Sequence, residues 1–342
     1  MLGATRVHSD PSHTLSFKQI PNSAKDVVVS KPRYEWRHYD HPQKFLLALR
    51  RSNPEWSRDN EWQSHWVFRG CASASWNLVP SAWLKLKFKS LYDKYLEWDW
   101  KDLELEASLV SDYMISKILG GCDKERAKHV IAQVLFERSL IYDYYKTLDR
   151  MGFPVPGFVE PRDDHFKYQR WFFENGKFPP IFALAQHHGI PTRLLDWTLN
   201  PLKAIFFAAS ENTSVKDDDD LAVWAWNVES EDENFNSPMF EVQRAHVGFL
   251  SAQEGVFSYM PDAASHYLNN GKWPIFEEWI PTHLLRKLSI ARKHAPELLR
   301  LLYLEGITPF SLMPTHDNIT KSVETVMKHT IKPIKHADEE DD

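Results

Sequence analysis

The sequence predicts an α+β fold with a mixed or antiparallel β core, a large helical insertion and flanking helices. Short β-type runs at residues 65–70 and 221–228 are rich in Val, Phe and Trp. Residues 81–151 instead carry apolar side chains at helical spacing, for example Leu103 and Ala107. The two kinds of segment do not alternate as a regular βαβ series, so a doubly wound parallel sheet is not favoured.

The first element is predicted to be a helix within residues 35–49. Its apolar side chains Phe45, Leu46 and Leu49 recur at helical spacing. Inside the long helical stretch, Asp123 follows a Gly-Gly pair and is positioned to cap a new helix.

The middle of the chain predicts two helices separated by an irregular segment. Residues 181–187 have a helical pattern that stops at Gly189, a typical C-terminal glycine. Residues 191–198 are interpreted as irregular. Pro201 then stands in the first turn of an apolar helix over residues 202–210, where its missing N–H is tolerated.

Two segments of the C-terminal third carry a recognisable pattern. Residues 249–259 indicate a pair of strands around Gly255. Residues 283–306 indicate a helix interrupted at Pro296.

One domain is predicted between two polar ends. Residues 1–34 are interpreted as a flexible arm, residues 35–318 as the domain containing the insertion, and residues 319–342, with their acidic end, as a tail.

Composition narrows the function classes. The net charge of -6 argues against a general polyanion binder, and no GxGxxG or GxxxxGK[ST] fingerprint occurs. Two cysteines, with no CxxC or HExxH motif, favour a reducing compartment and give no support for a zinc site. No signal-peptide pattern and no spanning apolar run are present, so we expect a cytoplasmic protein with no membrane partner.

The first candidate site residue is Arg69, which follows three apolar residues and precedes Gly70. A guanidinium at the end of a buried strand needs an anionic partner. That partner is either a protein carboxylate in a structural ion pair or a ligand phosphate held in bidentate fashion.

The second candidate is the polar segment between the two middle helices. It supplies Gln186, His187, His188, Thr192, Arg193, Asp196, Trp197 and Thr198. Such a density of polar groups forms either a ligand site or a hydrogen-bonded structural corner. A metal site built from the two histidines and Asp196 matches no known ligand spacing, and no metal is expected. The third candidate is Gln253-Glu254-Gly255, where a carboxylate beside a glycine is either turned into a cleft or simply exposed.

These segments together resemble the FRG-domain family, which is named for the tripeptide at Phe68-Arg69-Gly70. The resemblance continues in Trp-x-Leu-x-Pro-Ser at residues 76–81, in QHHGIPTRLLDWT and NPLKAIFFA from residue 186, in residues 252–257, and in Gly-Ile-Thr from residue 306. It departs from the family pattern at Glu254, where Gln is common, and near residue 314. The family is scattered among bacteria and phage-related loci.

In chain order, Arg69, the segment from Thr192 to Thr198, and Glu254 also loosely resemble the Arg, Ser/Thr and Glu motifs of ADP-ribosyltransferases. That resemblance implies NAD as substrate, with Arg69 on its phosphate and ribose. It implies Glu254 as the carboxylate that stabilises the cationic transition state, with His187 or His188 hydrogen-bonding ligand or transferring a proton. Aromatic walls for the nicotinamide are available at Trp197, Phe206, Phe207 and Phe257.

Three functions therefore stay open. The first is an ADP-ribosyltransferase or NAD glycohydrolase that binds a nucleotide, modifies a protein or nucleic-acid acceptor and serves as a bacterial toxin or phage-defence effector. The second is a non-catalytic module that recognises a ligand or protein. The third is a metal-dependent hydrolase or nuclease.

Overall fold

A computed structural model describes most of the chain from residue 34 onward. The described ranges are 34–57, 64–84, 88–108, 121, 123–155, 180–211, 219–229, 237–242, 244, 248–313 and 315–330. The arm expected at the N-terminus lies outside them, except for residue 34, and so do residues 331–342 of the expected tail.

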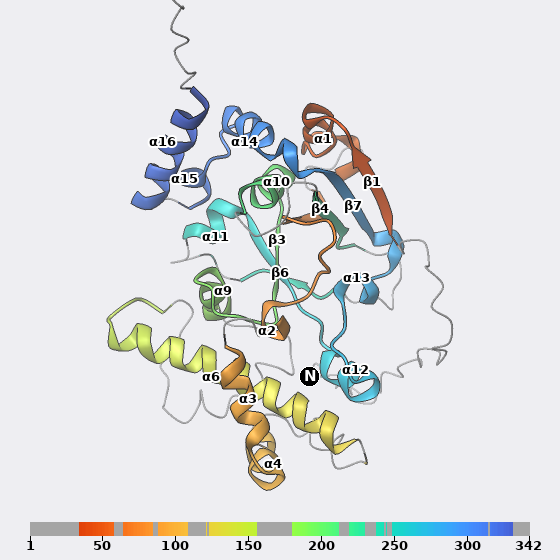
Figure 1. The fold of residues 1–342 in the computed structure, drawn as a ribbon, viewed down its shortest axis with the longest axis vertical. Helices are drawn as coiled ribbons and strands as arrows, with labels where there is room; N and C mark the ends of the chain where they lie inside the picture. The colour runs from red at the N-terminus through yellow and green to blue at the C-terminus, as the bar shows by residue number, and fades with distance from the viewer. Residues whose placement is uncertain are drawn as a thin grey trace, which may run out of the picture. The chain divides into compact units, whose positions relative to one another are not determined.

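A seven-stranded sheet forms the centre of the domain (Figure 1). Its order is β1-β7-β4-β2-β3-β6-β5, and every neighbouring pair is antiparallel except β1 and β7. The strands are β1 (Glu35–Tyr39), β2 (Trp66–Cys71), β3 (Leu195–Thr198), β4 (Asp220–Asn227), β5 (Met239–Phe240), β6 (Gly255–Ser258) and β7 (Leu285–Ala291). The mixed sheet with its many helices confirms the predicted α+β class.

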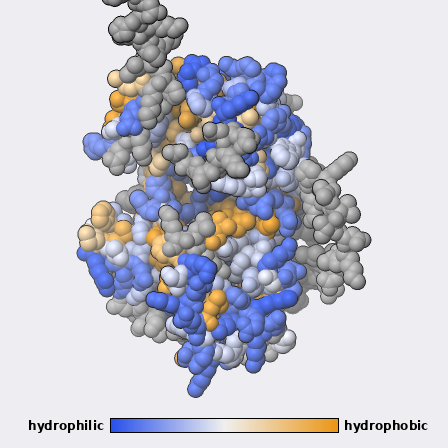
Figure 2. All heavy atoms as spheres, in the orientation of Figure 1, coloured by the Kyte–Doolittle hydropathy of each residue, from blue (hydrophilic) through white to orange (hydrophobic). Residues whose placement is uncertain are grey.

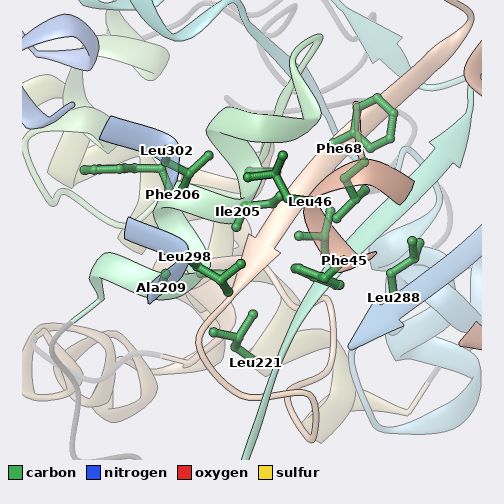
Figure 3. Packing of buried hydrophobic residues seen from close by; sticks show 14 of the residues in the cluster. Phe45, Leu46, Phe68, Ile205, Phe206, Ala209, Leu221, Leu288, Leu298 and Leu302 are labelled. Atoms are coloured by element: carbon green, nitrogen blue, oxygen red, sulfur yellow. The ribbon is translucent and has the colours of Figure 1, made fainter. Parts of the chain in front are cut away.

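Helix α10 (Pro201–Ser210) covers one face of the sheet together with α1 (Pro42–Ala48) and α14 (Ala295–Leu304). Figure 3 shows Phe68 of β2 and Ile205 and Phe206 of α10 among the side chains of this core. The Asn200 side chain caps α10 by accepting from the Leu202 N–H, 3.1 Å away, and a proline occupies the first turn. The capped, almost wholly apolar helix can therefore lie flat on β2 and β4.

Aromatic side chains fill the other face. Trp197, Trp226 and Phe276 pack with ring centroids 5.2–5.4 Å apart. The covering elements are α2 (Ser81–Leu84), α12 (Ala263–Asn270) and α13 (Phe276–Trp279). Offset and edge-on aromatic contacts add stability beyond the area they bury.

Beyond residue 88, the described part of the predicted insertion is mostly helical. It comprises α3 (Lys89–Glu97), α4 (Trp100–Ser108) and α6 (Lys124–Arg150). Asp123 caps α6 as expected, its carboxylate accepting from the Glu125 N–H at 2.9 Å. The remaining elements are α9 (Pro180–His187), α11 (Gly248–Gln253), α15 (Pro309–Leu312), α16 (His316–Thr330) and 3₁₀ turns at Pro54–Trp56, Thr282–Leu284 and Arg292–His294. None of the helices in these described ranges is long and apolar enough to cross a bilayer.

Four local predictions were wrong in part. Residues 35–39 form an edge strand before α1, because β7 supplies a pairing partner some 250 residues away. Residues 195–198, expected to be irregular, form β3. Residues 249–253, expected to belong to a strand, lie in α11. The predicted helix over 283–306 is strand β7 followed by α14, with Pro296 in the first turn of α14.

Candidate functional site

The candidate site is a pocket where the central sheet divides. Strands β2 and β4 pair over six positions, whereas β2 and β3 pair only at Phe68 and Thr198. Beyond that point β2 and β3 separate. A pocket of about 340 Å³ is lined there by residues of β2, β3 and β6 and of helices α9, α10 and α11, with Met313 after α15. In Figure 2, hydrophobic surface lies in the middle of the face that is turned to the viewer, in the region where Figure 1 labels β6.

Arg69 and Asp196 meet across the division between β2 and β3. The Arg69 Nη1 donates to the Asp196 backbone oxygen at 2.8 Å and lies 3.6 Å from the Asp196 Oδ2. The Arg69 Nε is buried and has no hydrogen-bond partner among the described residues. Buried donors are normally satisfied, so this unpaired Nε is unusual. The exposed part of the Arg69 side chain lines the pocket, where a guanidinium suits an anionic ligand.

A chain of hydrogen bonds fixes the orientation of the Asp196 carboxylate. The Gln186 Nε2 donates to the Asp196 Oδ1 at 2.5 Å, and the Thr192 hydroxyl donates to the Gln186 Oε1. The Thr192 oxygen in turn accepts from the Leu194 N–H at 3.2 Å. Because Thr192 is buried and both sides of the Gln186 amide are engaged, the amide has one favoured orientation.

His187 forms part of the pocket wall and is held neutral. Its ring stacks on Phe249 with centroids 3.5 Å apart. Burial, and secondarily the neighbouring His188, lowers the pKa of His187 to about 4. At pH 7 the ring is therefore uncharged and can accept a hydrogen bond. His188 lies edge-on to His187 and does not line the pocket.

Glu254 is placed beside the pocket and faces cations of the protein. Its carboxylate pairs with the Lys203 Nζ at 2.8 Å, accepts from the Asn200 Nδ2 at 3.2 Å and pairs with Arg51. Burial alone would raise the pKa of Glu254, but these hydrogen bonds and charges hold it below its usual value. Its backbone φ of 51° lies in the left-handed region, where the chain turns from α11 into β6. Glu254 is not among the pocket-lining residues.

The remaining predicted residues divide between pocket and scaffold. Gly70, Trp197, Thr198 and Gln253 line the pocket with Arg69, Gln186, His187 and Asp196. Trp197 also donates to the Ser258 hydroxyl at 2.8 Å. Arg193 points away from the pocket, with its Nε 2.7 Å from the buried carboxylate of Glu137 on α6.

The aromatic walls differ from the expected set. Phe207 and Phe257 line the pocket, as does Trp197. Phe206, on the same helix as Phe207, is instead buried in the core between α10 and the sheet. Phe249 is a wall that the sequence reasoning missed. Had residues 248–253 been recognised as a helix, the i, i+4 spacing of Phe249 and Gln253 would have placed both on one face.

Across the described ranges, no group of three or more His, Cys, Asp or Glu side chains is arranged to hold a metal ion.

A family model of the FRG domain matches residues 158–217. Within that span the structure describes α9, the loop carrying Thr192 and Asp196, β3 and α10. The match confirms the FRG resemblance for this segment, which supplies a large part of the pocket wall. Neither the curated proteins nor the solved structures contained a match to the chain.

Proposed function

We propose that the pocket binds NAD and that the protein is an NAD-consuming enzyme of the ADP-ribosyltransferase or NAD glycohydrolase type. The observation that carries the proposal is the meeting of Arg69 and Asp196 in one pocket with aromatic walls. A cation, an anion and apolar rings at one place match the phosphate, ribose and base of a nucleotide. The volume of about 340 Å³ falls within the usual range for small-molecule sites.

The Arg69 guanidinium is the phosphate-binding group in this proposal. One of its nitrogens, Nη1, is committed to the Asp196 backbone, but the side chain lines the pocket and is 26% exposed. A guanidinium offers five N–H donors, so donors remain for a phosphate oxygen. Charge-assisted bonds of this kind are roughly twice as strong as neutral ones.

The aromatic walls are the proposed site for the base. Phe207, Phe249 and Phe257 approach the pocket from α10, α11 and β6. The faces of these rings suit a flat heterocycle such as nicotinamide. Neutral His187, stacked on Phe249, adds a hydrogen-bonding edge without a charge that would repel the cationic nicotinamide ring.

The proposed reaction breaks the bond between the ribose C1′ and the nicotinamide nitrogen. The electron pair of that bond stays on the nicotinamide, which leaves as a neutral molecule, and positive charge develops on the ribose. A water molecule or an acceptor hydroxyl forms the new C1′–O bond and releases its proton to solvent or to His187. A fixed carboxylate lowers the barrier by stabilising the developing positive charge. An enzyme of this type in the cytoplasm of a bacterium would suit a toxin or phage-defence effector acting on a protein or nucleic-acid acceptor.

One observation favours the second candidate, a non-catalytic recognition module. Thr192 and Gln186 already satisfy each other, and Arg193 is paired with Glu137. These contacts are what a structural corner beside a binding pocket would show. In that case the pocket would bind the nucleotide without cleaving it.

The test measures NAD affinity by calorimetry and nicotinamide release by chromatography on wild type, Arg69→Ala and Arg69→Lys. Arg300→Ala is the matched control, because Arg300 lies on the exposed surface of α14 and, among the described residues, pairs with its helix neighbour Glu297. We expect Arg69→Ala to weaken binding by about tenfold or more, Arg69→Lys to recover part of it, and Arg300→Ala to match wild type. Binding without nicotinamide release favours the recognition module, and a folded wild type that does not bind NAD refutes the proposal.

A further inference from the structure

We infer that Asp196, and not Glu254, is the carboxylate that acts on the bound ribose, and that Gln186 and Thr192 position it. This inference rests on the proposed function and reassigns the residue at its chemical centre. It comes from how the two carboxylates are paired and from which of them faces the pocket.

Glu254 is already committed to the protein. The Lys203 Nζ lies 2.8 Å from its Oε1, and Asn200 donates to the same oxygen. Its other oxygen, Oε2, pairs with Arg51. To act on a ligand, Glu254 would have to leave two cations, one of them the largely buried Lys203, and breaking a buried pair is costly.

This cluster also has a structural task. The Glu254 backbone oxygen accepts from the Leu199 N–H at 3.0 Å, and Lys203 also donates to the carbonyl of Ala252. The contacts join the start of α10 to the turn between α11 and β6. Glu254 therefore holds together the elements that carry the pocket wall.

Asp196 has the opposite character. Its side chain lines the pocket and is 54% exposed. One oxygen, Oδ1, accepts from Gln186, whereas Oδ2 lies 3.6 Å from Arg69, beyond hydrogen-bond distance. Among the described residues no donor bonds to that second oxygen. It is available to a ribose hydroxyl, and its charge is available to the ribose cation.

The adjacency of Asp196 and Arg69 also fits the ligand. In a nucleotide the ribose is joined directly to its phosphate, so a phosphate on Arg69 brings the ribose next to the neighbouring carboxylate. The two cations beside Glu254 are different: Lys203 and Arg51 bind its own oxygens, and neither is among the pocket-lining residues.

The positioning chain, the hydrogen bonds that run from Thr192 through Gln186 to Asp196, leads to a separate prediction. The Leu194 N–H donates to the Thr192 oxygen, so the Thr192 hydroxyl proton is left for the Gln186 Oε1. The amide N–H of Gln186 then points at Asp196. Without the Thr192 hydroxyl, the Gln186 amide can rotate and the carboxylate loses its fixed orientation. Preorganisation of this kind affects turnover more than ground-state binding.

The experiment compares the isosteric variants Asp196→Asn and Glu254→Gln for NAD affinity and nicotinamide release, with folding checked by circular dichroism and thermal denaturation. We expect Asp196→Asn to lower release about 100-fold and weaken NAD binding about tenfold. We expect Glu254→Gln to keep both within about threefold of wild type while melting at a lower temperature, because Lys203 and Arg51 lose their anion. Larger catalytic and binding losses in a folded Glu254→Gln than in Asp196→Asn overturn the inference.

Thr192→Val and Thr192→Ser test the positioning chain, with Ser restoring the hydroxyl. We expect Val to lower kcat about tenfold with little change in KM and Ser to recover most of it. Equal kcat for Val and wild type overturns the positioning role. If wild type binds NAD without releasing nicotinamide, the affinity comparison between Asp196→Asn and Glu254→Gln decides. If folded wild type neither binds nor cleaves NAD, the proposed function fails and this inference with it.

Discussion

Replacing Gly70 with alanine tests how closely α10 lies on strand β2. A Cβ at position 70 would overlap the Ala204 carbonyl oxygen and would lie 2.8 Å from the Ala208 nitrogen and 3.0 Å from the Ala204 carbonyl carbon. All three are backbone atoms of α10, so no side chain can rotate away. Ordinary contact begins near 3.4 Å, which means that helix and strand must separate.

The expected cost follows from that geometry. Overpacking a core costs typically about 1–3 kcal/mol, and we expect the upper end, about 3 kcal/mol, because the obstacle is backbone. The helix cannot shift freely, since α10 also packs on β4 and α14 in the core of Figure 3. For a domain of this size, about 3 kcal/mol lowers the melting temperature by roughly 6 °C.

Thermal denaturation of Gly70→Ala and Gly248→Ala measures the effect. Gly248 is the matched control, because a Cβ there, at the start of α11, would meet no atom of the described residues within 4 Å. We expect Gly248→Ala to melt at or slightly above the wild-type temperature, in keeping with the better helix propensity of alanine. If the two variants melt within about 1 °C of each other, the close approach of α10 and β2 is refuted.

Three further predictions concern stability. Arg193→Ala should lower the free energy of unfolding, measured in urea, by about 3 kcal/mol, because it leaves the buried Glu137 carboxylate without its partner at 2.7 Å. The double variant with Glu137→Gln should recover part of that loss, and no recovery would contradict the pairing. Asp123→Ala should cost about 1 kcal/mol through loss of the α6 cap, whereas Asp123→Asn should cost much less, and equal losses in urea melts would argue against capping. His187 has a pKa lowered to about 4, so the unfolded chain binds more protons than the folded chain between about pH 6.5 and 4, and stability should fall as the pH drops through that window. His187→Gln should flatten this part of the profile of melting temperature against pH, and an unchanged slope would contradict the neutral, buried ring.

Strong local patterns allowed part of the fold to be predicted from the sequence. The β2 and β4 segments are short, apolar and rich in β-formers, and they lie within one residue of the observed strands. Helix α10 is indicated in the sequence by Asn200, Pro201 and the apolar run that follows them. Such signals are carried by consecutive residues, so they can be recognised without knowledge of the partners.

The wrong predictions concern segments whose secondary structure depends on a strand partner that is distant in the sequence. Residues 285–291 read LRKLSIA, whose apolar positions fit a helix as well as a strand. They form β7 because β1 and β4 pair on either side of them. Lys287 in this strand is buried, with its ammonium over the rings of Trp36 and Trp224 at 4.7 Å from each centroid. A lysine in a central strand weakens a sequence-based strand prediction. Here the ammonium is stabilised by the distant tryptophan rings and by a hydrogen bond that it donates to the Ala74 carbonyl oxygen.

The same limit applies to the candidate site. The motif segments gave most pocket-lining residues, because each segment is polar where its neighbours are apolar. The partners of Glu254 were not predictable. Arg51 is 203 positions away in sequence. Lys203 lies in the otherwise apolar helix α10, whose sequence does not indicate an ion pair. A carboxylate beside a glycine looks the same in sequence whether it faces a ligand or a pair of cations.

The three residues of the FRG tripeptide have different roles, because consecutive side chains of a strand point to opposite faces of the sheet. Phe68 and Gly70 face α10: Phe68 is buried edge-on against Trp56 with centroids 5.2 Å apart, and Gly70 admits the helix backbone. Arg69 points the other way and reaches Asp196 across the gap between β2 and β3. The glycine brings α10 close enough for its Phe207 to form a pocket wall, and the arginine supplies a positive charge in that pocket. Substitutions at Gly70 should therefore act first on stability and those at Arg69 first on ligand binding, although the two residues are neighbours in one strand.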